Sequence, residues 1–325
     1  MKDSFHRQID YLRISVTDRC NLRCRYCMPA EGVSLKTHEE ILSLEEIFQL
    51  VELAVSLGFS KFRLTGGEPL VRKGILSLVE RMASLDGVRD LSMTTNGLLL
   101  AQYAGELKKA GLQRVNISLD TLKKDRFSYI TRIGQIERVF QGIEAALAAG
   151  LEPVKINVVV VRGFNDDEIL DFASLTRELP LHIRFIELMP IGESDGTAVQ
   201  KYLQIAEIKK VLARHDRLLP VQVEGNGPAD YVRLPDSKGT IGFIGALSRH
   251  FCRTCNRLRL TAEGKLRPCL QKELEFDLRA PLRQGADREA LGQVFMKALE
   301  QKPEKHNLEL DGWGKQERIM SQIGG

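Results

Sequence analysis

Two kinds of hydrophobic pattern alternate along the chain from residue 11 to about residue 188. Short segments alternate apolar and polar positions with the period of two of a half-buried strand, at residues 11–17, 61–65, 91–95, 114–119, 154–161 and 182–187. Segments with helical periodicity lie between them, and the first carries a capping box at Ser43 and Glu46. Further helices are expected to begin near Gly74, Leu100, Gln135 and Asp166 and, in two cases, to end at Gly111 and Gly150. This alternation predicts successive βα units around a parallel sheet or barrel.

One face of these strands is polar and basic. Side-chain direction alternates along a strand, so Arg13, Arg63, Lys155 and Arg184 are expected to share the inner face, while apolar neighbours pack under helices. A closed eight-stranded barrel fills its lumen with branched apolar side chains. Six strands with a basic inner face therefore predict an α/β fold, an incomplete (β/α)6 TIM-type barrel whose lumen holds a large, polar, anionic ligand.

The pattern changes after Gly192. A helix is expected near residues 206–214, with strand-like runs at 221–234 and 240–244, a second cysteine group and a final helix. We predict that residues 1–192 form the partial barrel with the first cysteine group. Residues 193–325 are then a smaller α+β domain that covers the open side, carries the second cysteine group and ends in Gly324 and Gly325.

Composition and charge bear on where the protein is located and on whether it binds membranes or nucleic acid, but they do not identify its function. The N-terminus has no apolar signal region and no stretch of about 18 apolar residues occurs, so we expect a cytoplasmic protein with no membrane association. The net charge is only +4 and no block of like charge occurs, so charge gives no argument for nucleic acid.

The six cysteines form two groups of three. In a cytoplasmic chain of this length, metal ligation is a better interpretation than disulfides. The first group, Cys20, Cys24 and Cys27, directly follows the first strand. Three thiolates from one loop can ligate three irons of a [4Fe–4S] cubane and leave the fourth iron open. A closed zinc site needs four ligands, and this loop offers no fourth cysteine or nearby pair of histidines.

The second group is Cys252, Cys255 and Cys269. Arg257 and Arg259 lie between its members, spaced to face one side of a strand, which favours a second cluster beside an anion site. The alternative is a zinc site that His250 completes. The residues themselves leave both interpretations open.

Anion binding cannot use a Walker loop, because the chain contains no GxxxxGK[ST] sequence. The charge must come from strand residues, namely Arg13, Lys61, Arg63, Lys155, Arg184, Arg257 and Arg259. A single arginine in a strand is usually a solvated edge residue. Several on one inner face indicate a binding site for an anion.

A glycine pair, Gly66 and Gly67, opens a GGEP sequence directly after the second strand. It lets backbone approach a ligand closely, although alone it is equally a strand-to-helix turn. The cysteine spacing, the aromatic Tyr26 before the last cysteine and GGEP together resemble the radical S-adenosylmethionine superfamily. The resemblance implies that the open iron chelates S-adenosylmethionine, whose reductive cleavage gives methionine and a 5′-deoxyadenosyl radical.

A longer set of motifs narrows the resemblance. In order, the chain contains YLRISVTDRCNLRCRYCMP, RLTGGEPLVRKG, MTTNG, VNISLDTL, VKINVVVVRGFND, IRFIELMPIG, FCRTCNRLRLTAEGKLRPCL and RIMSQIGG. This set is similar to that of the GTP 3′,8-cyclase family, loosening only between residues 193 and 238. The resemblance implies a lyase that abstracts the ribose C3′ hydrogen of GTP and joins C3′ to C8. The product is (8S)-3′,8-cyclo-7,8-dihydroguanosine 5′-triphosphate, the first intermediate of molybdenum cofactor biosynthesis.

The same resemblance implies roles for particular residues. The S-adenosylmethionine contacts would be Tyr26, Gly67, Ser118 and Met189. The GTP contacts would be Arg13, Lys61, Arg63, Thr94, Lys155, Arg257 and Arg259, with the second cluster meeting the guanine. The catalytic set would be Arg257, Arg259, Arg184 and the terminal Gly324 and Gly325. The tail would reach the active site, and whether Arg184 binds substrate or assists radical reduction stays open.

The resemblance also implies partners: a low-potential electron donor and, as consumer of the product, cyclic pyranopterin monophosphate synthase. A homodimer is a hypothesis that the residues do not decide. Two alternatives compete: a radical enzyme acting on a peptide, and a redox sensor that holds zinc and a cluster without catalysis. The terminal glycines have their own alternatives, a frayed end and a sulfur-carrier tag.

Overall fold

The structure is a computed structural model that describes residues 1–34, 36–189, 198–223, 227–306, 318 and 320–323. Its centre is a twelve-stranded sheet in the order β12-β11-β10-β1-β2-β3-β4-β5-β6-β9-β8-β7. The six predicted strands are confirmed to within two residues, as β1 (Tyr11–Ser15), β2 (Lys61–Thr65), β3 (Asp90–Thr95), β4 (Arg114–Ser118), β5 (Lys155–Val160) and β6 (His182–Glu187). All six run parallel, as βα units require.

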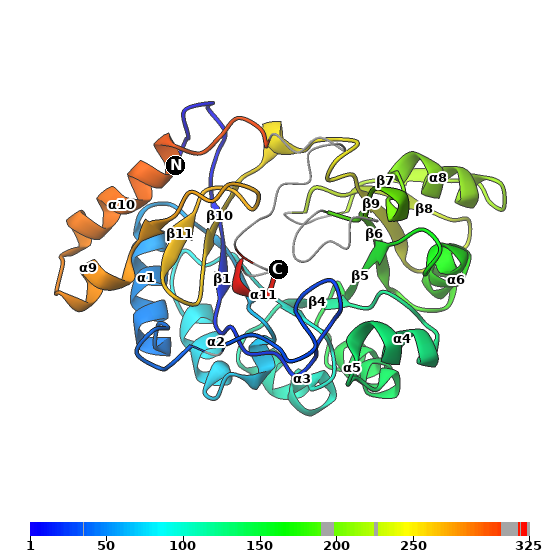
Figure 1. Ribbon diagram of the computed structural model, residues 1–325, viewed down its shortest axis with the longest axis horizontal. Coiled ribbons are helices and arrows are strands. Elements are labelled where there is room, and N and C mark those ends of the chain that lie inside the picture. Colours follow the sequence, from blue (N-terminus) through cyan, green and yellow to red (C-terminus); the bar gives the residue numbers. More distant parts are fainter. Residues whose placement is uncertain (35, 190–197, 224–226, 307–317, 319, 324–325) are drawn as a thin grey trace.

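The strands curve around a centre, and helices cover the outer side of the curve (Figure 1). These helices are α1 (Leu44–Ser56), α2 (Ile75–Ala83), α3 (Leu100–Lys109), α4 (Lys124–Thr131), α5 (Ile136–Ala148) and α6 (Ile169–Glu178), with short turns η1 (Pro69–Val71) and η2 (Asp166–Glu168). The predicted capping box is confirmed: Ser43 Oγ accepts from Glu46 N at 3.1 Å, and Glu46 Oε2 accepts from Ser43 N at 2.7 Å. Helix α4 was not predicted, because it buries only Phe127 and Thr131 and has a weak apolar stripe.

The C-terminal segment extends the sheet at both edges. Strand β10 (Arg257–Leu260) pairs parallel with β1, and β9 (Thr240–Ile244) pairs parallel with β6. Antiparallel strands follow outward, β11 (Lys265–Arg267) and β12 (Phe276–Asp277) on one side, β8 (Asp230–Arg233) and β7 (Leu219–Val221) on the other. The predicted run 221–234 is thus two strands, since Gly227 and Pro228 interrupt it.

The remaining elements are α7 (Ala198–Lys201), α8 (Ile205–Ala213), η3 (Cys252–Thr254), α9 (Arg279–Arg283), α10 (Arg288–Glu300) and α11 (Met320–Ile323). The order of strands has separate edges at β12 and β7, so the predicted partial barrel is confirmed. That residues 1–192 and 193–325 are separate domains stays a prediction. None of the described helices is long and apolar enough to cross a membrane.

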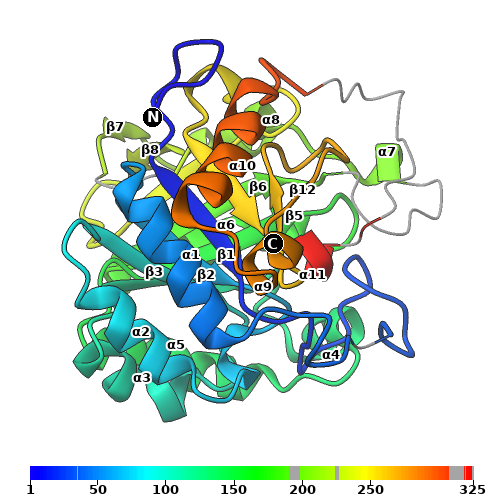
Figure 2. The same ribbon diagram turned by 90° about the vertical axis from the view of Figure 1, so that its left-hand side faces the viewer.

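The two faces of the sheet differ as the alternation predicts. Leu12, Phe62 and Ile117 are fully buried and belong to the same core cluster as apolar residues of α1, α2 and α3. Figure 2 shows these three helices packed together on one side of the sheet. The intervening positions carry polar side chains that are buried as well, among them Arg63 and Lys155. The apolar core therefore lies outside the curve of strands, and the polar groups lie inside it.

Candidate active site

The first cysteine group lies in the loop that leaves the carboxyl end of β1. Cys20, Cys24 and Cys27 are half-buried free thiols. Cys20 Sγ accepts hydrogen bonds from Leu22 N at 3.4 Å and Asn96 Nδ2 at 3.9 Å. Burial raises the pKa of the Cys24 thiol well above its usual range, and the neighbouring Cys27, a carboxylate and Cys20 raise it further. Partly buried thiols that raise one another's pKa ionise readily only when a bound metal balances their charge, so the donor set fits an iron–sulfur cluster.

The glycine pair Gly66 and Gly67 lies against the backbone of this loop. Gly67 N donates to Thr17 O at 2.9 Å, and Glu68 N donates to Arg19 O at 2.8 Å. A Cβ atom would lie 2.3 Å from Arg19 O at Gly67 and 2.6 Å from Thr17 O at Gly66. The close approach that requires glycine is therefore to the backbone of the cysteine loop. Contact of Gly67 with S-adenosylmethionine stays a prediction.

Glu68 joins this support to the end of β3. Its carboxylate is fully buried and accepts from Thr95 Oγ1 and Asn96 N, each at 2.7 Å, and from Leu70 N at 3.1 Å. Burial raises the pKa of Glu68 to about 7. Asn96 in turn donates to Asn21 Oδ1 at 2.7 Å, inside the cysteine loop. The second and third βα units thus fix the position of Cys20.

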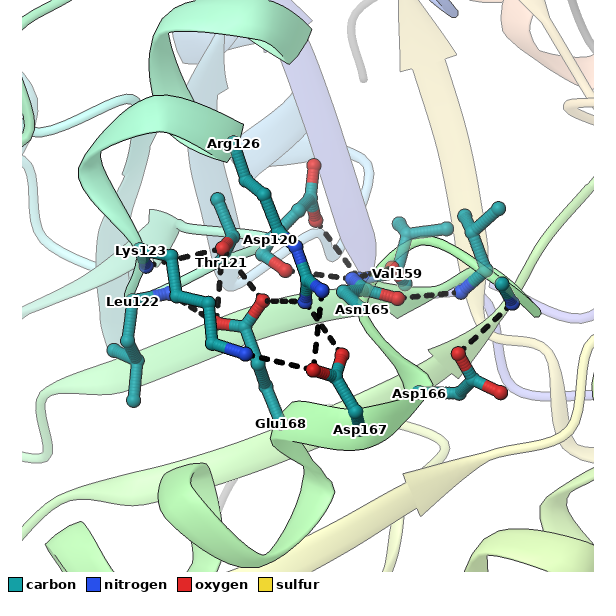
Figure 3. A network of polar contacts seen from close by, with 12 residues as sticks. Asp120, Thr121, Leu122, Lys123, Arg126, Val159, Asn165, Asp166, Asp167 and Glu168 are labelled. Carbon is teal, nitrogen blue, oxygen red and sulfur yellow. Dashed lines mark hydrogen bonds and ion pairs between the residues drawn. The ribbon is translucent and has the colours of Figure 1, made fainter.

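Tyr26, the aromatic residue of the loop, is fixed from β4 and β5. Its hydroxyl donates to Asp120 Oδ2 at 2.7 Å, and Asp120 Oδ1 accepts from Val159 N at 2.9 Å. Burial raises the pKa of Asp120 to about 6. Asn165 Nδ2 donates to the carbonyl of Asp120 at 2.6 Å, as Figure 3 shows. Asp120 therefore connects the cysteine loop to the segment that directly follows Ser118 and β4.

A buried carboxylate holds the rest of that loop. Glu168 accepts from Thr121 Oγ1 at 2.7 Å, Leu122 N at 2.7 Å and Arg126 Nη1 at 2.7 Å (Figure 3). Asp167 beside it pairs with Arg126 on the surface. The network gives the segment after β4 a fixed path.

The inner face concentrates positive charge. Arg13 on β1 is in register with Arg63 on β2 and with Arg259 on β10. Burial, and the other arginines around them, lower the pKa of Arg63 and of Arg259 to about 10. Burial and then Arg184 lower the pKa of Lys155 to about 7. Mutual lowering of this kind indicates an anion site.

Several buried polar atoms on this face have no hydrogen-bond partner among the described residues. They are Thr94 Oγ1, Asn157 Oδ1 and Arg257 Nε. Buried polar groups are normally satisfied, so these atoms favour a polar ligand in the lumen. Arg184 is oriented by Asn116, whose Oδ1 accepts from Arg184 Nη2 at 2.6 Å. Lys61 differs from the rest, because its ammonium pairs with Asp10 at 2.8 Å and is part-exposed.

The second cysteine group lies at the other end of the lumen. The loop of the first group leaves the carboxyl end of β1, whereas Cys255 precedes the amino end of the adjacent parallel strand β10. Burial raises the pKa of Cys252. Burial also acts to raise that of Cys255, but Lys302 and Arg257 outweigh it and the pKa is lowered. The basic residues therefore lie between the two cysteine groups.

The proposed zinc ligand His250 contacts another histidine. Its Nδ1 lies 3.1 Å from Nε2 of His306, and the ring centroids are 4.5 Å apart. Within the described ranges no three His, Cys, Asp or Glu side chains converge on a single-ion position. A cubane has no such requirement, because each thiolate binds a different iron.

The predicted S-adenosylmethionine contacts lie at the carboxyl ends of the strands. Met189 follows β6, and its Sδ accepts a hydrogen bond from Gln271 Nε2 at 3.7 Å. Gln271 lies two residues after Cys269 in the chain. Ser118 is the last residue of β4. A cavity of about 290 Å³ adjoins Cys20 and is lined by Asp18, Arg19, Cys20, Asn21, Arg23, Met28, Val33 and Val71.

The terminal Gly324 and Gly325 lie outside the described residues. Helix α11 immediately precedes them, and in the view of Figure 1 it overlies the centre of the curve of strands. Its last residue, Ile323, is buried. Arg318, two residues before α11, pairs with Glu263 in the β10–β11 turn at 2.7 Å and with Glu275 before β12 at 2.7 Å.

Sequence reasoning missed the residues that hold the cysteines in place. Glu68 and Asp120 follow strands β2 and β4, so their places at strand ends were a usable signal. Lys302 and Arg318 gave no such signal, because each acts on residues far away in the chain.

Comparisons with known proteins identify the families that this chain resembles. Residues 14–176 match the family model "Radical SAM superfamily", and residues 181–308 match "Molybdenum Cofactor Synthesis C". The structure of Streptococcus suis SuiB bound to S-adenosylmethionine superposes with a TM-score of 0.59 at 14% identity, covering 88% of this chain and 68% of that one. At that identity the likeness concerns the fold alone. Fold and cysteine loop together define a radical S-adenosylmethionine protein.

Full-length relatives are more specific. Proteins named GTP 3′,8-cyclase from Moorella thermoacetica and Heliobacterium modesticaldum are 59% and 56% identical, over 100% of both chains in each pair. The chain belongs to the GTP 3′,8-cyclase family.

Proposed function

We propose that this protein converts GTP into (8S)-3′,8-cyclo-7,8-dihydroguanosine 5′-triphosphate, the first step of molybdenum cofactor biosynthesis. The basic lumen between two cysteine groups carries the proposal, because it offers one anionic substrate access to both. A peptide substrate would leave the half-buried Arg13 and the buried Arg63 and Arg259 without a role. A sensor without catalysis would leave them equally unexplained.

The first cysteine group would hold a [4Fe–4S] cluster and S-adenosylmethionine. When bound, this pair supplies the 5′-deoxyadenosyl radical that takes the C3′ hydrogen. The chain's own part is to fix the loop through Glu68 and Asp120 and to place Tyr26, Ser118 and Met189 around the cofactor. Burial of these supports keeps water from the reacting atoms.

The substrate would lie along the inner face. Arg13, Arg63 and Arg259 are adjacent in register and would bind the triphosphate by charge-assisted hydrogen bonds. Thr94 and Arg257 have buried polar atoms to offer the nucleotide. Lys155 would also be stabilised in its charged form by an anion, since its pKa is lowered to about 7 without one. Lys61 would join this set only if the substrate displaced Asp10.

The second group would hold a second [4Fe–4S] cluster that contacts the guanine. Arg257 and Arg259 connect this end of the lumen to the triphosphate. The terminal Gly324 and Gly325 would enter the lumen after α11 and complete the site, and Arg184 would serve substrate or radical reduction. A low-potential donor would supply electrons, and cyclic pyranopterin monophosphate synthase would consume the product in the cytoplasm.

The test uses anaerobic protein with reconstituted clusters, a reductant, S-adenosylmethionine and GTP. We expect 5′-deoxyadenosine and cyclised product to form together. Cys24→Ala should abolish both, because a cubane that loses one of three thiolates is not retained. Cys255→Ala should keep slow 5′-deoxyadenosine formation without cyclised product.

Different results would refute different parts. Cleavage of S-adenosylmethionine by Cys24→Ala would contradict the assignment of the first cluster. Normal product from Cys255→Ala would show that the second group is structural. Cleavage that depends on an added peptide and not on GTP would favour the alternative enzyme class.

A further inference from the structure

A buried lysine lies against the second cysteine group. Lys302 follows α10 and is 3% exposed. Its Nζ lies 2.6 Å from Pro268 O, 2.8 Å from Arg257 O and 3.6 Å from Cys255 Sγ. Nothing in the proposed chemistry uses this lysine. Burying a lysine ammonium costs free energy unless the charge is paired and hydrogen-bonded.

The three contacts require the charged form. Each partner is an acceptor: two are backbone carbonyls and the third is a thiolate once Cys255 ligates iron. A neutral amine has two N–H groups, whereas an ammonium has three, so only the ammonium satisfies all three partners.

The contacts also join the two arms of the group. Arg257 O belongs to the strand that follows Cys255, and Pro268 O belongs to the residue before Cys269. One ammonium therefore fixes the separation of two ligands that are far apart in the sequence.

The helix in front of Lys302 gives it a rigid base. Helix α10 buries Phe295, which packs edge-on against Phe59 with ring centroids 5.8 Å apart. Lys302 N donates to Leu299 O at 3.2 Å, which continues the helix end. Arg7 adds a second clamp, donating to Cys252 O at 2.8 Å and Pro303 O at 2.8 Å.

We propose that Lys302 is a positioning residue of the second iron–sulfur site, which sets the spacing of Cys255 and Cys269 and supplies a positive charge to the cluster. The inference rests on the proposed second cluster. Charge beside a cluster and hydrogen bonds to its sulfurs tune its potential. The charge of Lys302 stabilises the reduced, more negative state.

Two substitutions separate the two effects. Lys302→Met removes both donor and charge, and we expect iron to fall from about eight to about four atoms per chain, while S-adenosylmethionine cleavage is retained. Lys302→Gln keeps a donor without the charge, and we expect about eight irons with a more negative midpoint potential for one cluster. Iron analysis and potentiometric electron paramagnetic resonance measure both.

Lys305→Met is the matched control, because it removes the same charge from an exposed position three residues away. It should leave iron content and potential unchanged. If Lys302→Met also loses the first cluster, its fold has failed and the Lys302→Gln potential decides. If Lys302→Gln has the same iron content and the same cluster midpoint potentials as the unsubstituted protein, the proposal is overturned.

A different result marks failure of the proposed function itself. Unsubstituted protein with about four irons would refute the second cluster, and with it the role of Lys302. Eight irons in the unsubstituted protein and unchanged Lys302 variants would refute only the role of Lys302.

Discussion

The inner-face arginines and Lys155 are buried beside one another, an arrangement that costs free energy until an anion binds. Burial and the surrounding arginines lower the pKa of Arg63 and Arg259 to about 10 and that of Lys155 to about 7. Each of these groups is more stable with a triphosphate beside it than without one. The same residues should therefore control both substrate affinity and its dependence on pH.

Arg259→Ala should weaken GTP binding, because removing one partner of a buried charge-assisted pair costs about 2 to 5 kcal/mol. Equilibrium binding to cluster-loaded protein measures the effect. Arg288→Ala, on the exposed start of α10, is the control. A dissociation constant within about twofold of the original would exclude Arg259 from the substrate site.

Lys155 should make GTP binding depend on pH. Without ligand its pKa is about 7, and a bound anion raises it, so between these two pKa values binding takes up a proton. The titration of Lys155 should therefore leave the affinity for GTP constant below about pH 7. Above that it should fall by up to about tenfold per pH unit.

Calorimetry in buffers of different ionisation enthalpy measures the uptake. At about pH 8.5 the phosphates of GTP are ionised, so an uptake near one proton would come from the protein. Lys155→Met should abolish it. Uptake that persists in this variant would assign the linkage to another group.

At the scale of secondary-structure elements, an ion-pair cluster lies just before the short helix α11 in the chain. Arg318 joins Glu263 on the β10–β11 turn to Glu275 before β12, and Glu275 also pairs with Arg267. Arg267 Nη2 donates to Lys272 O at 2.7 Å in the loop after Cys269. The cluster thus connects the tail to the second cysteine group.

Arg318→Met should release α11 and lower cyclised product on the order of tenfold, since misplaced groups at the site lose orientation. Iron content and GTP affinity should stay within about twofold of those of the unsubstituted protein, because the ion pair between Glu275 and Arg267 remains. The ratio of product to 5′-deoxyadenosine measures the effect. Arg318→Lys should restore part of it, and an unchanged ratio in Arg318→Met would contradict the role.

Deleting Gly324 and Gly325 tests the tail more directly. Both clusters and GTP affinity should be nearly unchanged, whereas cyclised product should be lost. Normal turnover by the truncated protein would make the two glycines a frayed end.

At the scale of the whole molecule, the six βα units are completed by strands from the C-terminal segment. Strands β10 and β9 pair with the edges of β1 and β6. An unpaired edge strand promotes aggregation. The barrel and the C-terminal segment therefore share one sheet, which bears on whether they fold separately.

A fragment of residues 1–192 should aggregate, because it exposes two edges that the whole chain pairs. Size-exclusion chromatography and thermal unfolding, with the whole chain as control, check this. A monomeric fragment that unfolds cooperatively would support the two domains predicted from the sequence.

Local patterns in the sequence were enough to predict the strands and the polar inner face. The period of two separates polar positions such as Arg63 on β2 and Lys155 on β5 from the apolar positions next to them in the same strand. The capping box from Ser43 to Glu46 spans four residues, and the first cysteine group spans eight positions. These features depend on residues near one another in the chain.

Contacts between distant segments were decided only by the tertiary structure. Lys302 reaches Cys255 across 47 positions, and Asp120 reaches Tyr26 across 94. The placement of β10 beside β1 depends on how the whole sheet closes loops of more than 200 residues. A side chain's partner at such separation follows from packing of the complete chain, and no local periodicity encodes it.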